Sequence, residues 1–254
     1  MFGFQTFLFS IRALGLALLM MGISSSVLAE GLSLPQTRVI FPEKQKSVIA
    51  GIDNKGDNTY LIKAQVITSL TEKNNTLMVS TPFVVTPPLF RLEPQARYSV
   101  RIFTQSTTSL PTDRESVFYL SFLAIPATKP TDKNSTQVSI GLNTVIKLFY
   151  RPSGLISAAE AAQERLTFYA QSGQTVVHNP TPYYITLSSL QRDGRELDVA
   201  LAGPMLAPYS QVTLKGVSPG REMRYSVIND LGGDSQVYLT TVQLAPPHLK
   251  ELHQ

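Results

Sequence analysis

The sequence predicts an all-β protein of two antiparallel sandwich domains, and three observations support this prediction. Short segments in which apolar and polar residues alternate follow one another along the 254-residue chain, as in strands with one buried face. Patterns with a helical period are almost absent. The segment RPSG at Arg151–Gly154 interrupts the series, because proline removes a donor from a β-ladder and glycine relaxes the backbone. We therefore expect one domain on each side of this short hinge.

The first domain is expected over residues 30–150. Its alternating segments are separated by turn sequences such as DNKGDN and TEKNNT. In chain order, the expected strands are RVIF (38–41), SVIAGI (47–52), YLIKAQVI (60–67), FVVTPPLFRLEP (83–94), YSVRIF (98–103), VFYLSFLAI (117–125) and TQVSIGLNTVIKLFYRP (136–152). The polar run ATKPTDKNST before the last strand predicts a flexible loop. Short strands at such spacing are typical of a β-sandwich.

The second domain is expected over residues 151–254 and begins with SAAEAAQER (157–165), which predicts one or two helical turns. The expected strands are LTFYA (166–170), TVVHN (175–179), YYITLSSL (183–190), LDVAL (197–201), SQVTLK (210–215), MRYSVIND (223–230) and QVYLTTVQL (236–244). Asp193-Gly194 lies between alternating segments and is a strong hairpin signal. Two sandwiches joined by a short hinge leave a cleft between them, which is a common place for a binding site.

Residues 1–29 have the pattern of a cleavable export signal. One basic residue, Arg12, precedes an apolar run from Ala13 to Ile23, and Val27-Leu28-Ala29 offers a site for signal peptidase. The alternative is a membrane anchor, but the run is shorter than the roughly 20 residues that span a bilayer. No later segment is long and apolar enough to cross a membrane. We expect cleavage after Ala29 and a soluble exported chain without stable membrane insertion.

The composition argues against several function classes. A chain without cysteine has no disulfide, thiol nucleophile or cysteine-bound metal. A net charge of +4 without a block of Lys and Arg does not suggest nucleic-acid binding, although it favours an acidic partner surface. Of the three histidines, His178 lies at a strand end, and His248 and His253 lie in a polar tail. No catalytic or nucleotide-binding motif appears, so we expect no enzymatic activity, no metal and no other cofactor.

Three segments together resemble the periplasmic pilus-assembly chaperones of the chaperone–usher pathway. They are LPTDRESVFYLSFLAIPA (110–127), IKLFYRP (146–152), and the pair NPTPYYITL (179–187) and VINDLGG (227–233). With the export signal and TRVIF, the similarity spans nearly the whole chain. Ser121 and Phe122 depart from the family pattern within a strand, where they are expected to alter packing. The short loop before the last strand and the absence of cysteine resemble the short-loop branch, which assembles rod-like pili.

The resemblance implies two immunoglobulin-like sandwiches in an L shape, like a boomerang. It also implies a non-enzymatic periplasmic chaperone that works without ATP, metal or cofactor. Such a chaperone binds a pilin subunit whose own sandwich lacks its last strand, fills the groove with its own strand, and delivers the subunit to an outer-membrane usher. Whether the free chain covers its edge strand by self-association stays open at this point.

The resemblance places the donor strand at the beginning of TQVSIGLNTVIKLFYRP. Val138, Ile140 and Leu142 match the alternating side chains that fill the pilin groove. Proteins normally suppress an apolar edge strand with charge or proline, but a protein that pairs with another chain would keep one. Without the resemblance, the alternation of these three residues would favour ordinary core positions.

The resemblance also assigns roles to five charged residues. Arg38 and Lys147 match the basic pair that binds the C-terminal carboxylate of the pilin in the interdomain cleft. Glu115, Arg151 and Asp230 match charged groups that bridge the two domains. The alternative for these residues is an exposed charge of little energetic weight.

Lys147 poses a problem of strand geometry. Strict alternation places it on the opposite face from Val138, Ile140 and Leu142, although all four are expected to serve the same client. A bulge, a strand twist, or a cleft reached from the other face would reconcile these roles.

Two other function classes compete with the chaperone. One is a secreted two-domain adhesin or structural pilus component, but pilins usually carry a cysteine pair and lack an internal IKLFYRP strand. The other is an exported β-sandwich enzyme, for which the sequence offers no catalytic constellation. Cell fractionation separates the chaperone from the adhesin, because the adhesin is found on the cell surface.

Overall fold

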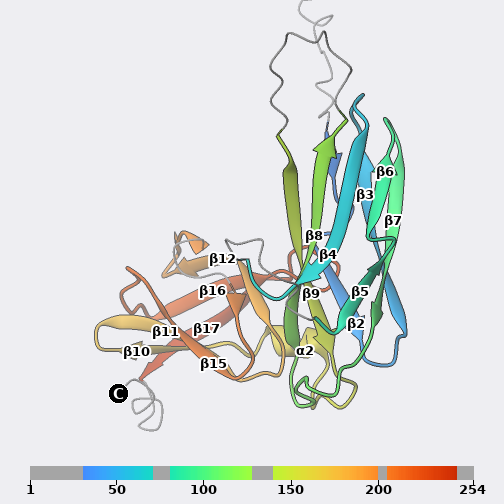
Figure 1. Ribbon diagram of the computed structural model, residues 1–254. Coiled ribbons are helices and arrows are strands. Elements are labelled where there is room, and N and C mark those ends of the chain that lie inside the picture. Colours follow the sequence, from blue (N-terminus) through green and yellow to red (C-terminus); the bar gives the residue numbers. More distant parts are fainter. Residues whose placement is uncertain (1–30, 71–80, 128–139, 200–204, 245–254) are drawn as a thin grey trace, which may run out of the picture. The chain divides into compact units, whose positions relative to one another are not determined.

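The computed structural model describes residues 31–70, 81–127, 140–199 and 205–244. Two separate hydrophobic cores lie within these ranges, one built from residues between Val39 and Tyr150 and one from residues between Leu166 and Val227. The predicted all-β fold of two immunoglobulin-like sandwiches is confirmed (Figure 1). The expected export signal, most of the loop ATKPTDKNST, and His248 and His253 lie outside the described residues.

The N-terminal sandwich has two sheets whose inner faces exclude water. One sheet has the order β1 (Leu32–Ser33), β3 (Ser47–Asn54), β7 (Arg97–Thr104) and β5 (Phe83–Thr86). The other has the order β2 (Arg38–Pro42), β9 (Leu142–Arg151), β8 (Ser116–Pro126), β4 (Tyr60–Ile67) and β6 (Leu89–Leu92). Fully buried side chains from both sheets fill the space between them, among them Phe41, Ile62, Ile102, Leu120 and Leu148.

The prediction of a single strand at FVVTPPLFRLEP is wrong. This segment forms two strands, β5 and β6, which lie in opposite sheets. Pro87 and Pro88 stand between the two strands and have no N–H for a ladder, so the chain changes sheet there. Residues Phe83 and Val85 before this break, and Phe90 and Leu92 after it, are all buried in the same core.

The C-terminal sandwich begins after α2 (Ala159–Gln163), which lies within the predicted helical segment. Its strand order is β13 (Arg195–Glu196), β12 (Ile185–Arg192), β16 (Glu222–Val227), β17 (Tyr238–Leu244), β10 (Thr167–Gln171), β11 (Gln174–Asn179) and β15 (Ser210–Leu214), with β14 (Met205–Leu206) paired to β12. Buried side chains such as Phe168, Leu190 and Tyr225 form its core. In the described part of the chain, no helix reaches the length and apolarity needed to cross a membrane.

The turn at Asp193-Gly194 confirms the predicted hairpin, with positive φ at both residues. The prediction of a strand at LDVAL is wrong for the part of this segment that the structure describes. Leu197 and Asp198 lie in a connection after β13. Leu197 instead packs against the C-terminal core. Its backbone N–H donates to Leu190 O, so its apolar character reflects core packing outside a strand.

The position of β9 between two unequal neighbours matters most for the site. β8 pairs with β9 from Ala124 opposite Leu142 to Ser116 opposite Tyr150. β2 runs parallel to β9 and pairs only from Lys147 to Arg151. Among the described residues, the first half of β9 therefore has a ladder partner on one side only.

The turn that ends β11 supplies a stability prediction. Asn179 is fully buried, and its Nδ2 donates to Tyr183 O and Ala207 O at 2.7 and 2.9 Å. Its Oδ1 accepts from the N–H and the hydroxyl of Thr181. Asn179→Ala leaves these groups unpaired, so we expect unfolding in urea to show a loss of about 3 kcal/mol. A loss no larger than that of the exposed control Asn58→Ala would contradict this account.

Candidate binding site

The open half of β9 carries exposed apolar side chains. Ile140, just before the strand, is 80% exposed, and Leu142 is 54% exposed. Val138, the third expected donor residue, lies outside the described residues. Isolated exposed leucines and isoleucines are common, but here they line an edge whose ladder groups have no partner on one side among the described residues, and proteins normally protect such edges. This edge can pair with another strand.

The two faces of β9 have different surroundings. On one face, the N-terminal core buries Ile146, Leu148 and Tyr150. On the other face, groups of the C-terminal sandwich contact Lys147, Phe149 and Arg151. The register with β8 is continuous, so no bulge rotates the strand. Leu142 therefore shares the face of the core, beyond the core's end, while Lys147 reaches the interdomain contact from the opposite face. Of the three geometric solutions, the continuous register therefore excludes a bulge between Leu142 and Lys147.

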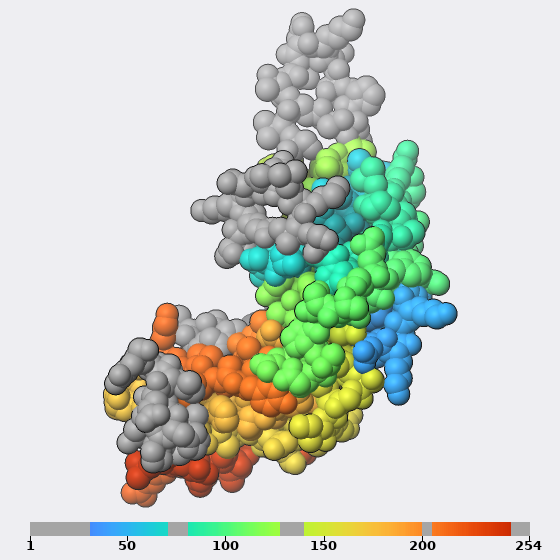
Figure 2. Space-filling model, turned by 60° about the horizontal axis from the view of Figure 1, so that its bottom comes forward, coloured from blue at the N-terminus to red at the C-terminus, as the bar shows by residue number. Residues whose placement is uncertain are grey.

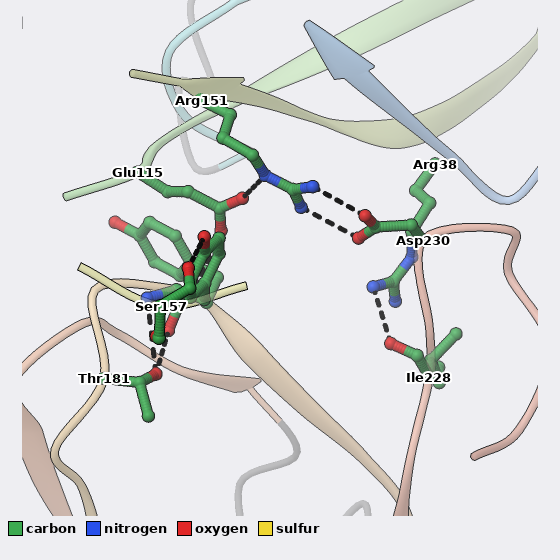
Figure 3. A network of polar contacts seen from close by, with 9 residues as sticks. Arg38, Glu115, Arg151, Ser157, Thr181, Ile228 and Asp230 are labelled. Atoms are coloured by element: carbon green, nitrogen blue, oxygen red, sulfur yellow. Dashed lines mark hydrogen bonds and ion pairs between the residues drawn. The ribbon is translucent and has the colours of Figure 1, made fainter. Parts of the chain in front are cut away.

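Arg38 is held between the two sandwiches. It is only 8% exposed, and its Nη1 donates to Ile228 O at 2.9 Å (Figure 3). Its guanidinium lies 5.5 Å from the ring centroid of Phe149. Its buried Nε has no hydrogen-bond partner among the described residues. Burial lowers the pKa of Arg38, with the charges of Asp230 and Glu115 opposing, yet an arginine stays protonated.

Lys147 lies directly opposite Arg38 in the parallel ladder, so the two side chains share one face. Its Nζ donates to Thr186 Oγ1 at 3.4 Å. Burial, together with the charge of Arg38, lowers the pKa of Lys147. Within the described ranges, neither cation forms an ion pair with a carboxylate. The two cations lie side by side, and neither has a carboxylate partner among the described residues. Such a pair forms a site suited to a carboxylate from another molecule.

A cavity of about 20 Å³ lies beside Arg38, with room for about one water-sized group. Its lining includes Arg151, Tyr184, Ile185 and Ile228. The space next to the guanidinium is therefore lined by both polar and apolar residues.

Arg151 joins Glu115 to Asp230. Its Nε donates to Glu115 Oε1 at 2.8 Å, and its Nη1 and Nη2 donate to the two oxygens of Asp230 at 2.6 and 2.8 Å (Figure 3). Glu115 is 3% exposed, and its second oxygen accepts from Tyr184 N at 2.9 Å. Burial raises the pKa of Glu115, while the positive charge of Arg151 opposes that rise. The three expected network residues are thus in direct contact, with Asp230 contributed by the C-terminal sandwich.

Aromatic side chains that the sequence reasoning missed surround these charges. Tyr183 places its ring 5.1 Å below the guanidinium of Arg151 and donates its hydroxyl to Ser157 O. Tyr184 contacts the ring of Phe149 at 5.7 Å between centroids. Phe149 could have been found from the sequence, because alternation places it on the same face as Lys147.

A further contact joins the loop before β8 to the loop before β15. Tyr209 donates its hydroxyl to Asp113 O at 3.3 Å, and the guanidinium of Arg114 lies 5.1 Å from its ring centroid. The space-filling view shows these two segments, green and orange, in contact (Figure 2). No local pattern signals this contact, since its partners lie 96 residues apart in the chain.

Comparison with known proteins assigns most of the chain to two family descriptions. Residues 31–156 match "Pili and flagellar-assembly chaperone, PapD N-terminal domain". Residues 161–238 match "Pili assembly chaperone PapD, C-terminal domain".

Individual relatives agree with these matches. The probable fimbrial chaperone LpfB of Escherichia coli O157:H7 is 34% identical over 221 residues, which cover 87% of this chain and 92% of that protein. The chaperone protein FimC of Escherichia coli strain K12 is 34% identical over 204 residues, which cover 80% of each chain. The crystal structure of the Escherichia coli chaperone DraB has a TM-score of 0.71 and 30% identity, and the match covers 84% of this chain and 97% of that one.

Proposed function

Because the chain belongs to the family of periplasmic pilus-assembly chaperones, which bind pilin subunits without enzymatic activity, we propose that it does so with the open edge of β9. The observation that carries the proposal is the exposure of Ile140 and Leu142 beside an edge of β9 that, within the described ranges, has no strand paired to it. Together with Val138, these side chains would fill the groove of a pilin that lacks its last strand. Burial contributes roughly 1.5–3 kcal/mol for each side chain, before ordering costs.

Arg38 and Lys147 would bind the C-terminal carboxylate of the pilin. Their adjacency in the ladder, the unpaired Nε of Arg38 and the lack of an ion pair within the described residues support this role. Each charge-assisted hydrogen bond is worth about 1.5–3 kcal/mol. A fixed terminus would also set the register of the pilin along β9, where a slip of one residue turns the wrong face inward.

Glu115, Arg151 and Asp230 would hold the two sandwiches in the orientation that keeps this site open. Their mutual contacts support that role. The same proposal divides the chain into an export signal over residues 1–29, an N-terminal domain over 30–150 and a C-terminal domain over 151–254. The separate cores and the start of the first family match at residue 31 support this division.

We also assign the chain to the short-loop branch and expect it to deliver its pilins to an outer-membrane usher. β8 ends at Pro126 and β9 begins at Leu142, which leaves a short connection, and the chain has no cysteine.

Co-expression with the pilin encoded nearby tests the proposal. We expect a one-to-one complex that purifies from the periplasmic extract. Recovery of the chain on the cell surface, with no complex in the extract, would instead support the adhesin or structural pilus component.

The pH dependence of binding tests the role of Lys147. A bound carboxylate favours the protonated amine, so the pKa of Lys147 is higher in the complex than in the free chain, where burial lowers it from the ordinary value of a lysine. Binding therefore takes up a proton between these two pKa values, and the affinity falls as the pH rises through that window. Calorimetric titrations at rising pH should show the fall in the native chain but not in Lys147→Arg. The same fall in both proteins would exclude Lys147 as its cause.

A further inference from the structure

The turn that follows β16 connects the C-terminal sandwich to both charged clusters of the site. Ile228 O accepts the hydrogen bond from Arg38 Nη1, and the carboxylate of Asp230 accepts two hydrogen bonds from Arg151 (Figure 3). Residues 228–234 therefore present one backbone carbonyl and one carboxylate at fixed spacing to the N-terminal sandwich. The conformation of this turn sets the position of the carbonyl that accepts from Arg38.

Asn229 closes the turn with its side chain. Its Oδ1 accepts from Leu231 N at 3.0 Å and from Gly233 N at 3.1 Å, and its Nδ2 donates to Asp234 O at 3.4 Å. Backbone hydrogen bonds between Asn229 and Gly233, and between Gly232 and Asn229, complete the structure. Such a side chain–backbone turn orders the segment locally, without help from the core.

Ile228, the residue before Asn229, is hydrogen-bonded to Arg38 and to Thr186, and Thr186 is the hydrogen-bond partner of Lys147. Its N–H donates to Thr186 O at 2.8 Å, and the hydroxyl of Thr186 accepts from Lys147 Nζ. Its carbonyl accepts from Arg38. A displacement of Ile228 would therefore change the surroundings of Arg38 and Lys147 together.

Gly232 fixes the turn from its other end. It has φ of +86°, and a Cβ at this position would overlap Thr37 Oγ1, which lies next to Arg38. Only glycine allows the turn to approach the beginning of β2 this closely without strain. The turn is thus determined both by its own hydrogen bonds and by its close approach to Thr37, the residue before the strand that carries Arg38.

We propose that Asn229 is a positioning residue for carboxylate binding: by closing the turn, it holds the Ile228 carbonyl where it orients Arg38 toward the ligand. This inference rests on the proposed carboxylate-binding role of Arg38 and Lys147. Among the described residues, the side chain of Asn229 forms its hydrogen bonds within the turn and not with either cation, so its effect passes through the turn.

The experiment measures the affinity of the full chain for two peptides that differ only at their C-terminus. An acetylated octapeptide of alternating valine and threonine is titrated once with a free C-terminal carboxylate and once as the amide. In the native chain, we expect the acid to bind at least about tenfold more tightly than the amide. In Asn229→Ala, this ratio should fall to about two while the affinity for the amide stays the same, and Asn229→Ser should give an intermediate ratio because a hydroxyl closes such turns more weakly.

Asn54→Ala is the matched control. Asn54 also closes a turn, with hydrogen bonds to Asn58 O, Glu93 O and Gly56 N, but it lies in the N-terminal sandwich outside the proposed site. We expect this variant to lose stability and keep the native ratio. Gly232→Ala displaces the same turn without changing Asn229, and its ratio should fall as well.

Each outcome has a distinct meaning. A native ratio near one would overturn the proposed carboxylate site and, with it, the role of Asn229. A native ratio of ten or more that persists in folded Asn229→Ala would overturn only the role of Asn229. Equal weakening of acid and amide would mean that Asn229 serves general stability, which also contradicts the inference.

Discussion

Arg38→Ala and Lys147→Ala are each expected to abolish recovery of the pilin complex while the chaperone itself stays folded. Each substitution removes one of two adjacent cations, neither of which has an ion-pair partner among the described residues. The loss of charge-assisted hydrogen bonds to a carboxylate costs about 1.5–3 kcal/mol for each bond, so affinity should fall about 100-fold. Affinity co-purification of the pilin with the tagged chaperone measures this effect.

Arg101→Ala is the control for loss of positive charge. Arg101 lies in β7, is exposed, and belongs to the same sandwich. The native amount of complex is expected from this variant, because a general electrostatic attraction is weak at physiological salt. If both Arg38→Ala and Lys147→Ala yield as much complex as Arg101→Ala, the carboxylate does not bind at this pair.

Most of the fold could be predicted because the alternation of apolar and polar residues along a strand indicates which side chains share a face. In β9, it correctly separates Ile146 and Leu148 from Lys147. Alternation does not record what covers a face, so by itself it could not distinguish Ile140 and Leu142 from core residues. Both residues precede Lys147, where the pairing of β2 with β9 begins, and the position of that boundary is a property of the sheet.

The candidate site was less predictable, because its contacts join distant parts of the chain. Arg38 and Ile228 are 190 residues apart, and no local pattern indicates that a backbone carbonyl orients the arginine. The charged residues were identified by resemblance alone. Phe149 is an exception, since its face follows from that of Lys147, whereas Tyr183 and Thr186 become visible only when the two sandwiches meet.

Substitutions in the donor strand are expected to have the second large effect on the yield of the pilin complex. Leu142→Asp is expected to block the complex, because a carboxylate would have to enter an apolar groove without a partner. Ile140→Asp should act in the same way, since its side chain is even more exposed in the free chain. Both positions are exposed before binding, so the substitutions should leave the melting temperature of the chaperone nearly unchanged while the yield of pilin falls below detection.

The variant Asn143→Asp tests why Leu142→Asp would block the complex. The charge could be excluded from the apolar groove of the pilin, or the edge of β9 could tolerate no charge on either face. Asn143 lies next to Leu142 on the same free edge but points to the opposite face, where its Oδ1 accepts from Ser121 Oγ. The substitution adds the same charge at the same depth along the strand and preserves this acceptor. Normal complex formation by Asn143→Asp, together with failure of Leu142→Asp, would place the pilin on the face of Leu142. Equal failure of both variants would mean that the edge tolerates no charge at all, and equal success would exclude β9 as the donor strand.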